Sequence, residues 1–271
     1  MEYKKLLDGW KRFGSTPEDV CKQTLGVSAD KIHERVVIAP WWKPEVFDGL
    51  GNEYTFLSKS YNSAIKVWNI QTNNFNITYI QTGIGAPVLA DAVLALGCTK
   101  CKKAIFIGSV GALDTNISIG DIVLPKLSIC GDGMSRYLKG SPLKTNDPFG
   151  DVCYPDSEMF QVLKNYTQRI CKENSIKWHI GTTFSIDTIV AQYAYIDEIL
   201  GMGCNVIEME TASAFRAASI ANIKLVALFS VSDNTLQSKS LISGRTEQEM
   251  NYRKEVRKNI FPKIILETLI N

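Results

Sequence analysis

The sequence lacks long apolar runs, and no stretch of its 271 residues approaches the roughly 20 apolar residues of a membrane-spanning helix. Residues 1–5 also lack the apolar core of a secretory signal. Charge of one sign is scarce as well, because 30 Lys and Arg residues nearly balance 28 Asp and Glu residues and leave a net charge of +2. This excludes a large field that would attract nucleic acid or a membrane surface. We expect a cytoplasmic protein that binds neither.

Cysteine pairs suited to disulfides or zinc are also missing. The chain has seven cysteines, an odd number, which favours reduced thiols over a disulfide framework. Cys98 and Cys101 have the CxxC spacing, but no second Cys pair or His pair lies at metal-ligand spacing. We therefore predict no metal site. The sequence also contains no internal repeat and no Pro/Gly/Ser-rich linker that would divide it.

Apolar strand-like runs alternate with helical patterns along most of the chain. Residues 1–34 form a helical N-terminal extension in this prediction, and residues 35–271 form one main domain. We predict strands over residues 35–39, 64–70, 77–81, 104–107, 121–125, 178–184, 205–207 and 225–231. We predict helices over residues 87–96, 157–171, 193–200, 211–221 and 247–270. This alternation indicates an α/β fold in which a mixed central β-sheet is flanked by helices on both faces, with ligands at the carboxyl ends of strands.

Two glutamates, Glu208 and Glu210, stand where an apolar strand leads into a helix. Alternation along an extended segment places both side chains on one face, with Met209 on the other. Buried carboxylates are costly unless they accept hydrogen bonds, so a ligand rich in hydroxyl groups, such as a sugar, would suit them. The alternative is that the strand has already ended and that both acids are solvated at a helix start, where the helix dipole favours negative charge.

Small-residue or polar loops are expected after three predicted strands. Gly83 and Gly85 open a helix where backbone N–H groups can approach an anion, although a tight turn would also require glycine. Gly108 and Ser109 belong to a second loop that could hold a small anion or a water. Asp233 follows the third strand, either as part of a ligand site or as a helix cap. These loops are the candidate site.

Together these loops, in this order, resemble the nucleoside phosphorylase and nucleosidase family, which includes hexameric purine nucleoside phosphorylase, uridine phosphorylase and methylthioadenosine nucleosidase. The resemblance extends over residues 35–268 and is carried by segments 83–85, 108–111, 119–123, 179–181, 185–187, 206–210 and 232–233. It implies cleavage of the N-glycosidic bond of a nucleoside, with phosphate or water taking the sugar and no other cofactor. It also implies a homo-oligomer, either a dimer, a trimer or a hexamer.

The resemblance implies a role for each acid. Glu210 would accept hydrogen bonds from ribose hydroxyls, with Met209 packed on the sugar and Glu208 beside it. Asp233 matches the residue that protonates purine N7 in purine-specific members, which favours a purine nucleoside. A proton donor at neutral pH requires a raised pKa, which burial beside the base would provide. Arg245 would assist this acid, unless it is an arginine with a solvated head at a helix start.

The same matching assigns residues to the base and to the acceptor. The base would contact Phe184, Ile189, Ile207 and Ser232, and phosphate or water would lie beside Gly83, Gly85, Gly108 and Ser109. Ile189 occupies a position where many members stack an aromatic ring on the base. Trp41, Trp42 or Phe184 would have to provide that surface, although Phe184 also suits an ordinary core position.

The chain departs from the family where phosphorylases bind phosphate. Phe106 occupies the position of one arginine, and Glu45, or Lys43 if the loop shifts, occupies the position of another. Losing charge-assisted hydrogen bonds worth ~1.5 to 3 kcal/mol each would weaken phosphate binding. Phosphorolysis stays the first hypothesis because Lys43, Arg136 or a neighbouring subunit could supply cations.

Hydrolysis is the alternative, because nucleosidases of the family use a glutamate in the first loop to activate water. Glu45 lies within a residue of that position, although it also suits an exposed residue that opens a short helix after Pro44. A second alternative is a nucleoside-binding protein without turnover. The basic run over residues 253–258 is predicted to be a solvated face and receives no role.

Overall fold

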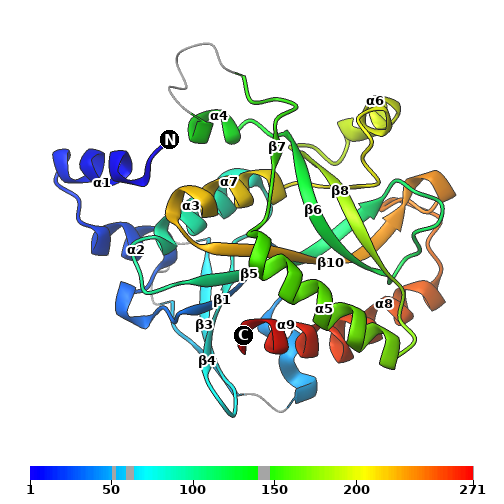
Figure 1. The fold of residues 1–271 in the computed structure, drawn as a ribbon, viewed down its shortest axis with the longest axis horizontal. Coiled ribbons are helices and arrows are strands. Elements are labelled where there is room, and N and C mark those ends of the chain that lie inside the picture. Colours follow the sequence, from blue (N-terminus) through cyan, green and yellow to red (C-terminus); the bar gives the residue numbers. More distant parts are fainter. Residues whose placement is uncertain (51–52, 59–63, 140–146, 271) are drawn as a thin grey trace.

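A computed structural model describes residues 1–50, 53–58, 64–139 and 147–270, and Figure 1 shows the arrangement of the elements. The strands are β1 (Arg35–Ala39), β2 (Glu53–Phe56), β3 (Lys66–Gln71), β4 (Asn76–Gln81), β5 (Lys103–Ala112), β6 (Ile122–Gly131), β7 (Val152–Cys153), β8 (Trp178–Ile186), β9 (Val206–Glu208) and β10 (Lys224–Asn234). The α-helices are α1 (Tyr3–Arg12), α2 (Pro17–Leu25), α3 (Ala86–Leu96), α4 (Ser135–Lys139), α5 (Ser157–Glu173), α6 (Ile196–Gly201), α7 (Thr211–Ala221), α8 (Glu247–Asn259) and α9 (Phe261–Ile270). No helix among the described residues combines the length and the apolar character needed to cross a membrane.

The strands form one mixed sheet with the order β10-β6-β8-β9-β5-β1-β4-β3-β2, and a further pairing of β10 with β5 closes part of it into a ring. Strand β5 runs parallel to β1 and β10 but antiparallel to β9. Its pairing with β1 ends at Phe106, and its pairing with β9 begins only at Gly111. Among the described strands, β5 therefore has no neighbour along that edge at Ser109, and the sheet opens there.

Helices cover both faces of this sheet. Successive residues of a strand point to opposite faces, so each strand contributes side chains to both apolar layers. In β1, Val36 and Ile38 face the apolar layer that contains α3 and α7. Val37 and Ala39 face the layer that contains α5, α8 and α9. Figure 1 shows α3 and α7 on one side of the sheet and α5 and α9 on the other. The predicted fold class, a mixed central sheet flanked by helices on both faces, is confirmed.

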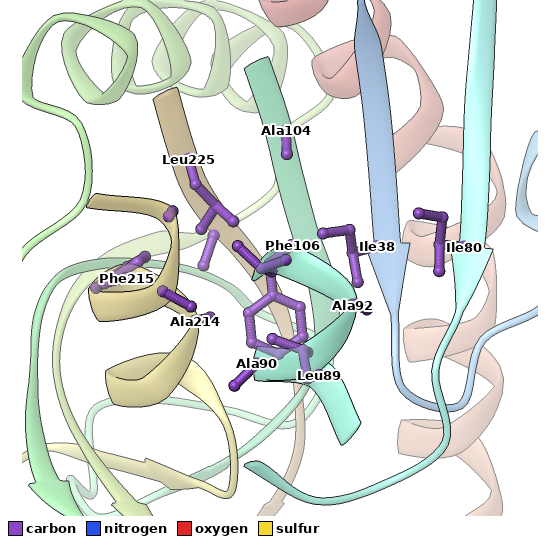
Figure 2. Close-up of a cluster of buried hydrophobic side chains, with 14 of the residues drawn as sticks. Ile38, Ile80, Leu89, Ala90, Ala92, Ala104, Phe106, Ala214, Phe215 and Leu225 are labelled. Atoms are coloured by element: carbon purple, nitrogen blue, oxygen red, sulfur yellow. The ribbon is translucent and has the colours of Figure 1, made fainter. Parts of the chain in front are cut away.

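Phe106 belongs to the layer formed by α3 and α7. It is 1% exposed, and its ring meets that of Phe229 edge-on at a centroid distance of 5.0 Å. Figure 2 shows Phe106 beside Leu89 and Ala90 of α3, with Ala214 of α7 in the same cluster. Phe106, which occupies the position that the resemblance assigns to a phosphate-binding arginine, is thus an apolar core residue in this chain.

The N-terminal helices α1 and α2 pack against α3. Tyr3 Oη donates to the carbonyl oxygen of Leu94 at 2.7 Å, and Cys21 Sγ donates to that of Ala95 at 3.5 Å. Leu25 at the end of α2 is fully buried in the layer of α3 and α7. The first helices therefore extend the same apolar core that supports β1.

Several elements differ from the sequence-based prediction: β5, β6 and β10 are longer than predicted, β2, β7 and α4 were not predicted, and one predicted helix is divided. Strand β5 continues to Ala112 and β10 to Asn234, so Gly108, Ser109 and Asp233 lie within strands and not in loops. Their partners across the closed ring keep these small and polar residues extended. The helix predicted over residues 247–270 is divided into α8 and α9, because proline at the start of α9 has no N–H to continue the α8 hydrogen bonds.

Candidate active site

A cavity of about 320 Å³ lies where the sheet opens, at the C-terminal halves of β5 and β10. The predicted site residues that line it are Gly108, Ser109, Ile189, Ile207, Glu208, Met209, Glu210, Ser232, Asp233 and Arg245. Trp41, Trp42 and Arg253 line it as well. This volume is at the small end for a ligand pocket. In the described part of the chain, no three or more His, Cys, Asp or Glu residues cluster as a metal site would require.

Two predicted site residues lie away from the cavity lining. Phe184 is 3% exposed and packs in an apolar cluster with Ile129 and Ile199. Glu45 is exposed in the 3₁₀ segment η2 (Pro44–Leu50), where it borders a separate hollow together with Lys254. The structure thus gives Phe184 a core position, and it does not bring Glu45 together with the other candidate residues.

Gly83 and Gly85 do not line the cavity themselves, although Ile84 between them does. Both residues have positive φ angles, +87° and +120°, which only glycine adopts readily. The Gly83 N–H donates to Pro40 O at 3.0 Å, and the Gly85 N–H donates to Glu210 Oε1 at 2.7 Å. The sequence predicts that these amides approach a ligand anion, but in the structure both donate to other residues of the protein. The turn therefore positions Glu210.

Glu208 ends β9 and caps α7 with its side chain. Its Oε1 accepts a hydrogen bond from Ser185 Oγ at 2.5 Å, and its Oε2 accepts the N–H groups of Glu210 at 2.7 Å and Thr211 at 2.8 Å. Burial raises the pKa of Glu208, and these donors together with the helix N-terminus oppose that rise. Both carboxylate oxygens are therefore engaged within the protein, although the side chain borders the cavity.

Glu210 stands at the N-terminus of α7 and is 5% exposed. Burial raises its pKa to about 8, the nearby charge of Glu208 adds to the rise, and the amides of Gly85 and Met209 oppose it. An ionised carboxylate offers about four acceptor positions. Glu210 can therefore keep the hydrogen bond from Gly85 and still accept those of ligand hydroxyl groups.

Asp233 owes its position to a bulge in β10. Val231 pairs with Val110 and Asp233 pairs with Gly111, so that Ser232 is an extra residue between them. A Cβ on Gly111 would lie 3.1 Å from Asp233 Oδ2, so glycine leaves room for the carboxyl group. Burial raises the pKa of Asp233, opposed by the Ser232 hydroxyl, which donates to Oδ1 at 2.5 Å. A buried carboxyl group with a raised pKa can hold and donate a proton.

Arg245 is positioned near this acid by backbone carbonyls. Its Nη2 donates to Leu241 O at 2.8 Å, and its Nη1 donates to Ser232 O at 3.5 Å. Its positive charge favours the ionised form of Asp233 and so opposes the effect of burial on that pKa. Arg245 is thus placed to stabilise Asp233 after the acid has given up a proton.

The part of the cavity around Ser109 contains Arg253, a residue to which the sequence analysis assigns no role. Arg253 of α8 is 9% exposed, and its Nη2 donates to Ser109 Oγ at 2.5 Å. Trp42 Nε1 donates to the same oxygen at 3.3 Å. The expectation of a solvated basic run was wrong at Arg253. A signal was present, because Arg253 shares the buried side of α8 with Val256 at helical spacing.

A larger hollow, of about 970 Å³, lies at the opposite ends of β5 and β10. Two of its lysines are already in ion pairs, Lys102 with Glu34 at 2.7 Å and Lys224 with Glu158 at 2.5 Å. It contains none of the buried acids described above. The smaller cavity is therefore the better candidate for chemistry.

Comparison with known proteins identifies the family of the chain. Residues 44–264 match the family model described as the phosphorylase superfamily. A DeoD-type purine nucleoside phosphorylase of Anoxybacillus flavithermus is 24% identical over 176 residues, covering 65% of this chain and 70% of that protein. The solved uridine phosphorylase of Vibrio fischeri has a TM-score of 0.68 at 18% identity, covering 90% of this chain and 95% of its own. The AMP nucleosidase of Bacteroides thetaiotaomicron has a TM-score of 0.67 at 15% identity, covering 94% and 95%.

Proposed function

The chain belongs to the phosphorylase superfamily, and from this membership we propose that it cleaves the N-glycosidic bond of a purine nucleoside and transfers the ribose to inorganic phosphate. At the level of the family, it is an enzyme of the nucleoside phosphorylase and nucleosidase type. The observation that carries the finer proposal is the pair of buried acids, Glu210 and Asp233, which line one cavity.

The two acids suit the two ends of a nucleoside. Cleavage passes through a ribose that resembles an oxocarbenium ion, so the enzyme must hold an electron-poor sugar while the base departs. In the proposed reaction, Glu210 accepts hydrogen bonds from the ribose hydroxyls. Asp233 gives its proton to N7 of the purine as the glycosidic electrons move to the base, and a phosphate oxygen forms the new bond to C1′. The products are the free purine and ribose 1-phosphate.

The environment of Asp233 favours a purine over a pyrimidine. A pyrimidine nucleoside has no N7 to receive a proton, so a buried acid with a raised pKa would have no partner there. Arg245 then stabilises the carboxylate that remains after proton transfer. Ile189 and Ile207 line the same cavity and offer an apolar surface to the base.

The position of Glu45 supports phosphate over water as the acceptor. Activation of water requires a general base within hydrogen-bond reach of the attacking oxygen. Glu45 is exposed and borders another hollow, so the geometry gives no support to its proposed role in hydrolysis. Hydrolysis and nucleoside binding without turnover remain the alternatives against which the proposal is tested.

Base release should be measured from inosine, adenosine, guanosine and uridine, each with and without phosphate. We expect release from at least one purine nucleoside, little release from uridine, and dependence on phosphate. Undiminished release without phosphate would replace phosphorolysis by hydrolysis. Calorimetric binding of a purine nucleoside without base release under either condition would instead leave a binding protein. The same assays should be run on Asp233→Asn, which removes the proposed proton donor. Asp30→Asn, a change of an exposed acid in the segment η1 (Ala29–Lys31), is its matched control.

A further inference from the structure

Arg253 is a buried cation without an ion-pair partner in the described part of the chain. Its side chain is only 9% exposed. Its single side-chain hydrogen bond in the described part of the chain is the one from Nη2 to the neutral hydroxyl of Ser109, and its Nε has no partner there. Burying a charge costs on the order of several kcal/mol unless it is paired and fully hydrogen-bonded. An uncompensated guanidinium beside a cavity therefore calls for an anion.

Ser109 shows in which direction that anion would lie. Arg253 and Trp42 both donate to Ser109 Oγ, and neither side chain can accept a hydrogen bond in return. The hydroxyl proton of Ser109 is therefore free to be donated elsewhere. Ser109 is exposed toward the cavity, which it lines together with Arg253. The side chains of Ser109, Trp42 and Arg253 therefore offer only hydrogen-bond donors to the cavity, and they match a ligand that accepts several hydrogen bonds at once.

The same feature argues against water as the occupant. A water that attacks the sugar must give its proton to an acceptor. Arg253 and Trp42 have no acceptor atoms, and Ser109 Oγ already receives two hydrogen bonds. A phosphate dianion can attack through an oxygen that carries no proton, so no acceptor is needed for that step, and it accepts hydrogen bonds on several oxygens. Arginine is suited to such an oxyanion because its planar fork can donate two parallel hydrogen bonds.

Two further arginines, Arg245 and Arg257, add positive charge near Arg253. Burial lowers the pKa of Arg253 to about 10, and repulsion from Arg257 and Arg245 adds to the fall, so that Arg253 remains charged at neutral pH. Arg257 lies one turn further along α8, with its guanidinium 5.1 Å from the ring centroid of Trp42. The negative charge of Asp233 opposes this fall.

The close approach of α8 to the sheet makes this placement possible. Gly120 has a φ of +93°, and a Cβ there would lie 2.5 Å from Tyr252 Cδ1 and 3.3 Å from the Cα of Arg253. Only a residue without a side chain lets the helix pack this near. Arg253 then reaches across to Ser109, 144 positions earlier in the chain.

From these observations we infer that Arg253, with Ser109 and Trp42, forms the binding site for the reactive phosphate, and that the chain supplies this cation from α8 where Phe106 leaves β5 without one. This inference rests on the proposed phosphorolysis. Arg253 is then a catalytic residue, since it contacts the phosphate whose oxygen attacks C1′. The shared chemistry is a phosphate group, whether of inorganic phosphate or of a nucleotide 5′ position.

The test compares Arg253→Gln with Lys254→Gln. Lys254 is an exposed cation at the adjacent position of α8, so its variant removes the same charge from the same helix away from the cavity. We expect Arg253→Gln to raise the KM for phosphate about 10- to 100-fold, the loss expected for a charge-assisted hydrogen bond. The KM for the nucleoside should change less than about threefold, because the substituted side chain does not contact it. Lys254→Gln should leave both constants unchanged.

Direct binding keeps this test independent of turnover. Titration of inorganic phosphate into the protein alone, followed by calorimetry, should show the same loss for Arg253→Gln. Loss of phosphate binding in a protein that cleaves no nucleoside would uphold the anion site and refute the proposed function. A raised KM for a nucleoside 5′-monophosphate, cleaved without added phosphate, would uphold the site but assign it to the substrate.

Two further variants cover a failure of Arg253→Gln to fold. Arg253→Lys keeps the charge but not the planar fork, and it should recover part of the phosphate affinity. Ser109→Ala removes the hydroxyl donor and should raise the KM for phosphate severalfold. The inference is overturned if phosphate binding and its KM are unchanged in Arg253→Gln and Ser109→Ala. It is equally overturned if only kcat falls, because Arg253 would then act on Asp233 and not on phosphate.

Discussion

Replacing Glu210 by Gln should make the protein more stable and nearly inactive. The side chain is 5% exposed, and its burial and the neighbouring charge of Glu208 both disfavour the ionised form. Glutamine has the same shape and can still accept the hydrogen bond from Gly85 N–H, now 2.7 Å from Oε1. The substitution therefore removes the unfavourable charge and retains the local structure.

The size of the effect depends on pH. The pKa of Glu210 rises from an ordinary value of 4.5 to about 8 on folding. Between these values the folded state binds more protons than the unfolded state, so the wild-type protein loses stability as pH rises through this window. A rise of this size corresponds to at most about 5 kcal/mol. Glu210→Gln should match the wild type near pH 4.5 and exceed it by an amount approaching this limit above pH 8.

The measurement is urea unfolding of both proteins at pH 5, 7 and 8.5, with Glu53→Gln, a change of an exposed glutamate of β2, as the control. At pH 8.5, above the pKa of Glu210, activity should fall by about 100-fold or more, because the ribose hydroxyls lose charge-assisted hydrogen bonds of ~1.5 to 3 kcal/mol each. A stability difference that is the same at all three pH values would refute the reasoning. So would a variant less stable than the wild type at pH 8.5.

Three further substitutions test other parts of the site and its support. Asp233→Asn should lower kcat for a purine nucleoside by ~10²- to 10⁴-fold, and the loss of wild-type activity as pH rises through the raised pKa of Asp233 should disappear from the pH–rate profile. Glu249→Gln should cost about 1 kcal/mol at pH 7 in urea unfolding, because it removes the charge that pairs with Lys239 at 2.5 Å and that this hydrogen bond stabilises, while glutamine can still form the capping box with Thr246. The pKa of Glu249 is lowered to about 2, so this difference should vanish as pH falls from 4.5 to 2. Gly120→Ala should destabilise the protein by about 2 kcal/mol and raise the KM for phosphate, since its Cβ would displace Tyr252 and α8; unchanged stability would contradict this packing.

The layered fold could be predicted because each buried strand has its own apolar signal. In β1, four successive apolar residues that pack on both faces identify a strand covered by helices without further information. The C-terminal half of β5 has no such signal. Gly108 and Ser109 interrupt the apolar pattern, and their extended conformation depends on pairing with β10, more than 100 residues away. Tertiary pairing outweighed local propensity there.

The acids of the site could also be found from sequence, but their hydrogen-bond partners could not. Glu208 and Glu210 both border one cavity, but β9 ends at Glu208 and Met209 lines the same cavity, so this placement does not follow from strand alternation. Alternation also could not distinguish the two acids, because the difference arises from donors elsewhere in the chain: Ser185 engages Glu208, whereas the Gly85 amide leaves Glu210 able to accept more hydrogen bonds. The same limit applies to Glu45, whose position in a neighbouring hollow follows from the path of η2 and not from its place in a motif.

The composition of residues 253–258 does not predict a site role for Arg253, because a basic run is typical of a solvated face and only the helical period separates Arg253 from its neighbours. Lys254 and Lys258 are exposed, whereas Arg253 lies three positions before the buried Val256 and shares its side of α8. An arginine on an apolar helix face normally signals a nearby acid, and in the described part of the chain this one has no ion-pair partner. If its counter-charge is supplied by phosphate, no residue of the chain could have revealed the pair. A cation whose partner is a substrate can be recognised only once the fold shows that the protein leaves it unpaired.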